Sequence, residues 1–114
     1  MKSYFSYFSF REKYFTNYLK YAKILKKYSK KIFKDPELKL IVFGSVIEND
    51  FTLSSDIDVL IISKKSPRKG LKRAKVLSKI YNSLGEPNPF EIHLITPSDW
   101  RKWYSHFVEK FVEV

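Results

Sequence analysis

The chain has 114 residues and a net charge of +10; 44% of its residues are hydrophobic, 30% are charged, and none is cysteine. This length supports one hydrophobic core, so a single domain over residues 1–114 is expected, and the lack of cysteine excludes disulfides and thiolate metal sites. The basic residues gather in segments 1–34 and 64–79, which favours a polyanion or an acidic partner protein, although a solvated lysine-rich helix face explains the same charge.

The sequence holds no stretch suited to a membrane. Its apolar runs are about four residues long, whereas roughly 20 are needed to cross a bilayer. Residues 1–10 are aromatic but are interrupted by three serines and offer no small-residue cleavage site, so they are not expected to form a signal peptide. A cytoplasmic protein without membrane contact is therefore expected.

Apolar residues recur at helical spacing from Tyr4 to about Phe33, with lysines on the opposite face and no glycine or proline between them. This pattern predicts one long amphipathic helix over residues 4–34, ended by Asp35-Pro36. The helix is longer than a small sheet can cover. Its aromatic first part is therefore expected to pack on another chain, as in a homo-oligomer.

The middle of the chain alternates strands and turns. Leu38 to Phe43 predicts a first strand that is covered on both faces, because no polar residue follows Lys39. Residues 46–50 suggest a short helix that starts at Ser45, and residues 53–55 a loop. Asp56 to Ser63 predicts a second strand.

The last third continues this alternation. The pattern predicts a helix over residues 71–84 ended by Gly85, and a third strand over residues 90–95. Thr96 and Pro97 are typical of a helix start, and the final helix is expected to run from Trp100 to about Phe111. The resulting order α-β-α-β-α-β-α predicts an α/β or α+β fold with a small mixed sheet flanked by helices.

Three acids mark the expected starts of two strands. Asp56 and Asp58 fall on the same face of a strand, with Cα atoms roughly 6.5–7 Å apart, so both can reach one hard cation. Alone, an Asp-x-Asp pair more often faces water. Glu91 opens the third strand, and three carboxylates at one sheet end can hold the two divalent ions of in-line phosphoryl transfer. His93 shares the face of Glu91 and is expected to support a ligand or touch substrate, or else to be a hydrogen-bonded core histidine.

Gly44 and Ser45 end the first strand. Glycine lets the backbone approach a phosphate closely, and Ser45 offers a hydroxyl and free N–H groups at a helix start. By itself, such a turn is also ordinary at the end of a strand.

Together these residues resemble a known family. Gly44-Ser45, ten further residues, Asp56-x-Asp58 and the third acid Glu91 resemble the minimal nucleotidyltransferases of the DNA polymerase beta-like superfamily, over Lys39 to Asp99. The resemblance implies Mg²⁺- or Mn²⁺-dependent transfer of a nucleoside monophosphate, expected to be AMP from ATP, to a hydroxyl. It implies catalytic and metal-binding roles for Asp56, Asp58 and Glu91. It implies nucleotide-binding roles for Gly44, Ser45 and Ser55.

Small stand-alone members of this superfamily are similar to antitoxins that pair with HEPN-type helical toxins, so such a partner is expected. After Gly-Ser many relatives carry a small residue and then Arg-Gly, whereas this chain has Val46-Ile47-Glu48-Asn49. Glu48 would repel a triphosphate if it pointed inward. An inactive antitoxin that neutralises its partner by binding, and a basic nucleic-acid-binding module, are the alternatives.

Overall fold

The computed structural model of the chain describes residues 4–52 and 54–114. Leu53, expected in the loop before Asp56, and the side chains of residues 4–9 lie outside this description, as do residues 1–3 of the expected domain. The elements, in chain order, are α1 (Tyr4–Thr16), α2 (Tyr18–Phe33), β1 (Lys39–Phe43), β2 (Ile57–Ile62), α3 (Gly70–Asn82), β3 (Phe90–Ile95), α4 (Pro97–Lys102), the short 3₁₀ helix η1 (Tyr104–His106) and β4 (Phe111–Glu113).

The four strands form one mixed sheet in the order β3-β2-β1-β4. Strand β1 is antiparallel to both of its neighbours, while β2 and β3 run parallel and are joined by the crossover helix α3. The expected small mixed sheet flanked by helices is confirmed.

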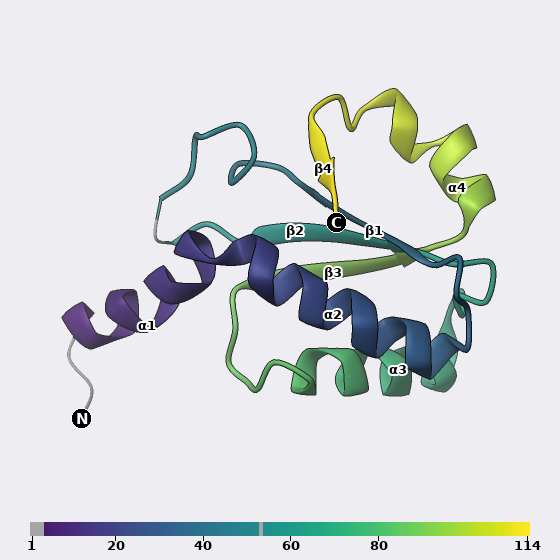
Figure 1. Ribbon diagram of the computed structural model, residues 1–114, viewed down its shortest axis with the longest axis horizontal. Helices are drawn as coiled ribbons and strands as arrows, with labels where there is room; N and C mark the ends of the chain where they lie inside the picture. Colours follow the sequence, from purple (N-terminus) through teal and green to yellow (C-terminus); the bar gives the residue numbers. More distant parts are fainter. Residues whose placement is uncertain (1–3, 53) are drawn as a thin grey trace.

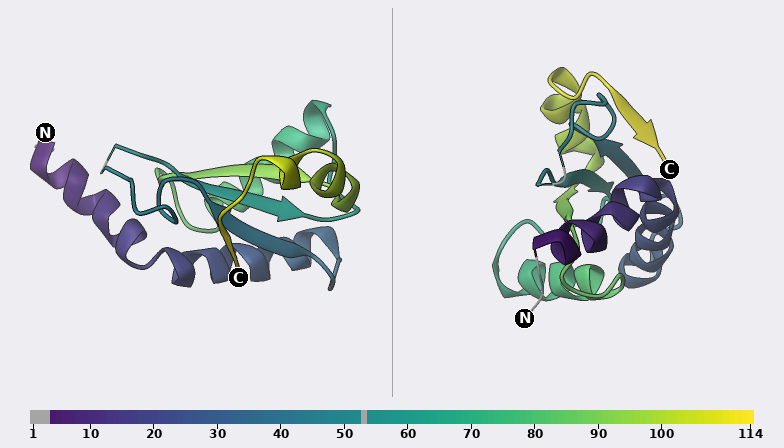
Figure 2. Two further views of the ribbon diagram at one scale, coloured as in Figure 1. Left: turned by 90° about the horizontal axis from the view of Figure 1, so that it is seen from above. Right: turned by 90° about the vertical axis from the view of Figure 1, so that its left-hand side faces the viewer.

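Helices cover the two faces of the sheet unequally. Figures 1 and 2 show α2 and α3 side by side on one face and α4 on the other. The first face packs its alternate strand residues, such as Val42, Val59 and Ile92, into the larger core with α2 and α3. The continuous apolar runs of the central strands correspond to the parts of the sheet that are covered on both faces.

The second face is only partly covered. Ile41, Leu60, Ile62 and Ile95 pack with Val108 and with residues of α4 and η1 in a smaller core. These strand residues belong to the half of the face nearest α4. The other half, toward the start of β2 and β3, carries polar side chains instead.

The single helix expected over residues 4–34 is divided at Asn17 into α1 and α2. Asn17 has φ −118° and ψ 33°, outside the helical region, and its side-chain amide donates to the carbonyl of Lys13 at 3.1 Å. Asparagine disfavours helix interiors because its side chain competes for backbone partners in this way. The break redirects α1, which extends beyond the end of the sheet (Figures 1 and 2).

The short helix expected over residues 46–50 is a hydrogen-bonded turn. The carbonyl of Gly44 accepts from the N–H groups of Ile47 and Glu48, both at 3.1 Å, but no helix continues from this turn. Asn49 has φ +56°, a left-handed conformation that ends a helical turn.

The final helix, expected to reach about Phe111, ends at Lys102. Thr96 does cap its start: Thr96 and Asp99 form a capping box, and Pro97 occupies the first turn. Trp103 then leaves the helical region with φ −132° and ψ −68°. Residues 111–113 instead form β4 on the open edge of β1, since an edge strand offers a full row of backbone partners.

Strand β3 forms the other edge of the sheet, and side chains satisfy several of its outward backbone groups. The N–H of Ile92 donates to the hydroxyl of Tyr81 at 2.8 Å, and the carbonyl of Leu94 accepts from the guanidinium of Arg73 at 3.1 Å. Both side chains come from α3. The Asn88 amide oxygen likewise accepts from the N–H of Phe90 at 3.1 Å.

None of the helices in the described part of the chain is both long enough and apolar enough to traverse a bilayer.

Candidate active site

The open half of the second sheet face brings Asp58 and Glu91 together. Asp58 on β2 is in register with Glu91 on the parallel strand β3, and Phe43 on β1 is in register with Asp58. The residues on either side of Asp58, Ile57 and Val59, are fully buried toward α2 and α3. Because successive side chains of a strand alternate between faces, this burial directs Asp58 to the opposite face.

Gly44 lies directly against the carboxylate of Asp58. A Cβ atom built on Gly44 would lie 2.2 Å from Oδ2 of Asp58, and the backbone of Gly44 has φ +83°. Only glycine avoids both the clash and the strain of this left-handed conformation. Gly44 is therefore the residue that lets the turn after β1 pass beside Asp58.

The pKa of Asp58 is raised from 3.8 to about 6. Burial is the largest cause, followed by hydrogen bonding to Glu91 and its charge, and then by the charge of Asp56. Among the residues that the structure describes, no lysine or arginine forms an ion pair with Asp58 or Glu91. The two carboxylates thus form a site of concentrated negative charge that a cation would stabilise.

His93 completes a possible set of metal ligands. Asp58, Glu91 and His93 each offer one donor atom, and the three atoms lie within 4.8 Å of one another. Nε2 of His93 is 3.7 Å from Oε1 of Glu91. Two carboxylates and an imidazole are donors that divalent metal ions accept, so these residues fit the metal that nucleotide chemistry requires.

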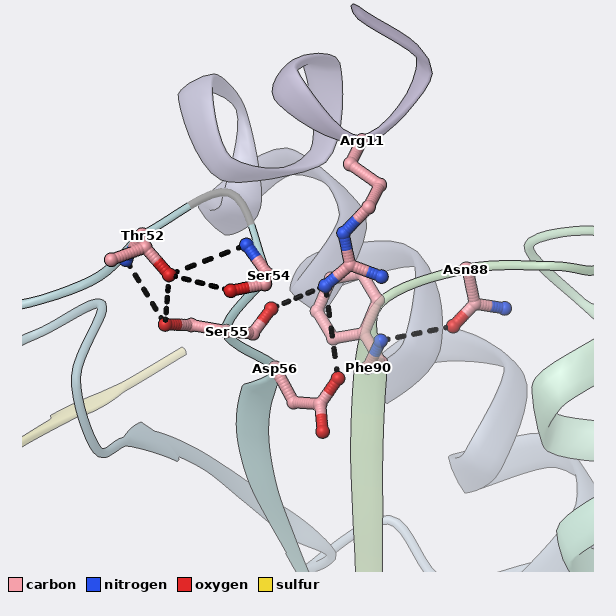
Figure 3. A network of polar contacts seen from close by, with 7 residues as sticks. All are labelled: Arg11, Thr52, Ser54, Ser55, Asp56, Asn88 and Phe90. Carbon is pink, nitrogen blue, oxygen red and sulfur yellow. Dashed lines mark hydrogen bonds and ion pairs between the residues drawn. The ribbon is translucent and has the colours of Figure 1, made fainter. Parts of the chain in front are cut away.

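Asp56 lies just before β2 and contacts α1. Oδ1 of Asp56 forms an ion pair with the guanidinium of Arg11 at 3.7 Å, and the same guanidinium donates to the backbone carbonyl of Ser55 (Figure 3). The side chain of Arg11 is 11% exposed, whereas that of Asp56 is 57% exposed. The third expected carboxylate is thus close enough to raise the pKa of Asp58 but is itself paired with Arg11.

Of the expected nucleotide-binding residues, Gly44 lies against Asp58 and Ser55 directly precedes Asp56. Ser55 accepts a hydrogen bond from the N–H of Thr52 at 3.0 Å within a small network that includes Ser54 (Figure 3). Ser45 is half-buried and its carbonyl accepts from the N–H of Asp50. Glu48 is exposed, and no cationic partner in the described part of the chain pairs with it.

Arg11 and Phe43 are two neighbours of the site that the sequence motifs do not include. Arg11 occupies the apolar stripe of α1, three and four residues before the buried Tyr14 and Phe15, and an arginine on such a stripe is the signal that identifies it. The ring of Phe43 lies 6.3 Å from the ring of His93. The alternation along β1 places Phe43 on the site face, but only the strand register shows that it lies beside His93.

Comparison with known proteins agrees with the resemblance found in the sequence. The model of the nucleotidyltransferase domain family matches residues 20–113. Two crystal structures, each described as a putative nucleotidyltransferase, are similar to the chain. One is 30% identical, with a TM-score of 0.62 over 81% of this chain and 95% of that chain. The other, from Sulfolobus solfataricus, is 17% identical, with a TM-score of 0.52 over 83% of this chain and 79% of that chain, a likeness of fold alone. No curated protein matches the chain.

Proposed function

The chain belongs to the nucleotidyltransferase domain family, and from this premise we propose that it transfers AMP from ATP to a hydroxyl group on a protein or nucleic-acid acceptor in the cytoplasm. The observation that carries the proposal is the register of the parallel strands, which sets Asp58 opposite Glu91 on the open half of the sheet face. Two carboxylates without a lysine or arginine partner in the described structure suit a divalent ion that also binds a triphosphate.

The side chains have distinct parts in this reaction. Asp58 and Glu91 would hold Mg²⁺ or Mn²⁺, and Asp56 would join them when it exchanges Arg11 for the metal. The metal, when bound, supplies positive charge that stabilises the phosphates and activates the acceptor hydroxyl. Gly44 and Ser45 would contact the phosphates from the turn after β1. The hydroxyl oxygen bonds to the α-phosphorus, the bond from that phosphorus to the bridging oxygen breaks, pyrophosphate leaves, and the hydroxyl proton passes to solvent.

We also propose that the acceptor is carried by a HEPN-like helical protein that this chain neutralises as an antitoxin. The support is the resemblance of its Gly-Ser and Asp-x-Asp pattern to such antitoxins. The exposed position of Glu48 supports activity, because an acid that points to solvent does not repel a bound triphosphate directly.

The proposed reaction is tested with ATP labelled at the α- or the γ-phosphorus, with Mg²⁺ or Mn²⁺, with and without the partner. We expect α-label, but no γ-label, to become covalently attached to the partner, and the attachment to fall at least a hundredfold in Asp58→Asn and Glu91→Gln. Transfer that is absent from the wild-type protein, or equal in the wild type and Asp58→Asn, would contradict the proposal.

A binding antitoxin without turnover is a second candidate. The observation that favours it is the ion pair of Asp56 with Arg11, which engages one of the three expected carboxylates. In this case an Asp56→Ala/Asp58→Ala variant still binds and neutralises the partner, and in the first case it binds but no longer neutralises.

A further inference from the structure

The residues that face the open half of the sheet include a nitrogen donor, His93, close to the two acids. Glu91 and His93 are two residues apart on β3 and therefore share a face, on which β2 presents Asp58. One donor atom from each lies within 4.8 Å of the others, and Nε2 of His93 is 3.7 Å from Glu91. Modest side-chain rotation brings such atoms to the roughly 2.0–2.2 Å bonds of a divalent metal.

His93 is also free to bind a metal. Its side chain is 35% exposed, and in the described part of the structure its only polar partner is the carboxylate of Glu91. The ring of Phe43 lies beside it, with the two ring centroids 6.3 Å apart. Asp56, which the sequence predicts as a metal ligand together with Asp58, is held instead by Arg11.

We propose that Asp58, Glu91 and His93 together bind one first-row transition-metal ion, with His93 as a direct nitrogen ligand. This inference rests on the proposed function and names the metal class of the same site. Mg²⁺ is bound almost entirely through oxygen and gives up its water reluctantly, whereas imidazole suits transition metals such as Fe²⁺, Co²⁺, Ni²⁺ and Zn²⁺, and Mn²⁺ binds both donor types. The site therefore favours a transition metal over Mg²⁺.

The test uses Mn²⁺ alone, without nucleotide, because its unpaired electrons report a coordinated nitrogen directly. Electron spin-echo spectra of the Mn²⁺-bound wild-type protein are expected to show coupling to ¹⁴N. Growth on ¹⁵N-labelled histidine should replace that coupling with one to ¹⁵N, and this arm needs no substitution that could disturb folding.

The chain has only two histidines, which provides a matched control. In His93→Gln we expect the nitrogen coupling to disappear and the dissociation constant for Mn²⁺ to rise about tenfold, with less than a twofold change for Mg²⁺. His106→Gln, at an exposed histidine outside this group of donors, should retain both the coupling and the affinity of the wild type. In competition, at least a tenfold excess of Mg²⁺ should be needed to displace half of the Mn²⁺.

The outcomes separate this inference from the proposed function. Mn²⁺ that binds without nitrogen coupling, or with coupling that persists in His93→Gln, overturns the inference, while nucleotide transfer remains intact. A wild-type protein that binds no Mn²⁺, or that releases it to an equal concentration of Mg²⁺, overturns it too. Nitrogen-coupled Mn²⁺ in a protein that transfers no label supports this metal site and contradicts the proposed function.

Discussion

At the scale of single residues, the site is built around Asp58, whose charged carboxylate destabilises the folded protein. Asp58 is half-buried and faces Glu91 and Asp56, and its charged form is disfavoured by both burial and repulsion. Buried like charges of this kind destabilise a protein unless a cation compensates them. This loss of stability is consistent with a role of Asp58 in binding a cation rather than in packing.

Asp58→Asn is expected to stabilise the metal-free protein. Folding raises the pKa of Asp58 from 3.8 to about 6, so the folded state binds the proton more tightly than the unfolded state does. The resulting contribution of Asp58 to stability is therefore fully present below pH 4 and is lost as the pH rises through 6. Removing the charge should raise the free energy of unfolding by about 1 kcal/mol at pH 7.5, a figure discounted for solvent screening, and by little at pH 4.

Denaturant unfolding at the two pH values measures this gain. Asp50→Asn, an exposed aspartate after the turn, is the matched control and should show no such pH dependence. An equal gain at both pH values would contradict the raised pKa of Asp58.

Gly44→Ala is expected to destabilise the protein more than Gly85→Ala. Both glycines have φ near +80°, so both substitutions carry the strain of the left-handed region, roughly 1–2 kcal/mol. Only at Gly44 does the new Cβ meet Asp58, whereas nothing lies within 4 Å at Gly85. Thermal unfolding should show an additional loss of about 1–3 kcal/mol for Gly44→Ala. Equal losses would mean that the turn shifts away from Asp58 without cost.

At the scale of elements, α1 anchors the loop that leads into β2. Phe15 of α1 stacks on Phe51 with ring centroids 5.0 Å apart, and Arg11 holds the Ser55 carbonyl and the Asp56 carboxylate. Residues 11–15 thus connect a helix that precedes the matched family domain to the start of the strand that carries Asp58. Asp56 can be repositioned only if this contact opens.

Arg11→Ala is expected to loosen the loop over residues 51–56. Its loss leaves the Ser55 carbonyl and the Asp56 carboxylate without their shared donor, which costs about 1–3 kcal/mol. Amide hydrogen exchange should accelerate in residues 51–57, and Arg11→Lys should give an intermediate effect because lysine keeps the charge but loses the planar fork. Glu12→Ala, the exposed neighbour on the same helix, is the control. Unchanged exchange in Arg11→Ala would show that Phe15 and Phe51 hold the loop alone.

The strands also show which secondary-structure elements the sequence patterns predict correctly. The first three strands are predicted to within one residue at each end because their apolar runs are continuous and are bounded by glycine, proline and acids. The pairing of Asp58 with Glu91 follows from two acids near the starts of neighbouring strands. The fourth strand is missed because Trp103, Phe107 and Phe111 recur every four residues, as in a helix, yet they remain 65%, 55% and 41% exposed.

Other features depend on contacts that no local pattern encodes. The break at Asn17 is only weakly predicted by an asparagine within a helical pattern. The ion pair of Arg11 with Asp56 joins residues 45 positions apart in the chain. No local pattern indicates this pair, so the sequence predicts only that Asp56 meets the other two acids.

At the scale of the whole molecule, the lysine-rich helices α2 and α3 and the candidate site lie on opposite sides of the sheet. Helices α2 and α3 contain no acid, and their exposed lysines include Lys23, Lys27 and Lys31 at successive turns of α2. Both helices cover the face away from Asp58 and Glu91 (Figure 1). The lysines repel one another, so the fold carries an electrostatic cost that salt or a polyanion would relieve.

Lys27→Glu is expected to stabilise the protein at low salt. The substitution turns two repulsive pairs, with Lys23 and Lys31, into attractive ones and should contribute about 0.5–1 kcal/mol. Thermal unfolding at about 20 mM and 500 mM NaCl should show this gain fading as salt screens the charges. Lys110→Glu, between α4 and β4 and beside an acid in sequence, should give no such gain. A gain that is independent of salt would contradict the electrostatic cause.

The side chains that cap the outer edge of β3 limit how copies of this molecule can associate through this edge. An exposed edge strand invites a second sheet to dock and is a common start of aggregation. Here Tyr81, Arg73 and Asn88 already occupy backbone groups that an incoming strand would need. Burial raises the pKa of Tyr81 further above physiological pH, so its hydroxyl is neutral there. Tyr81→Phe should therefore form thioflavin-positive aggregates faster than wild type, because the N–H of Ile92 on the β3 edge then lacks its side-chain partner and can pair with an incoming strand.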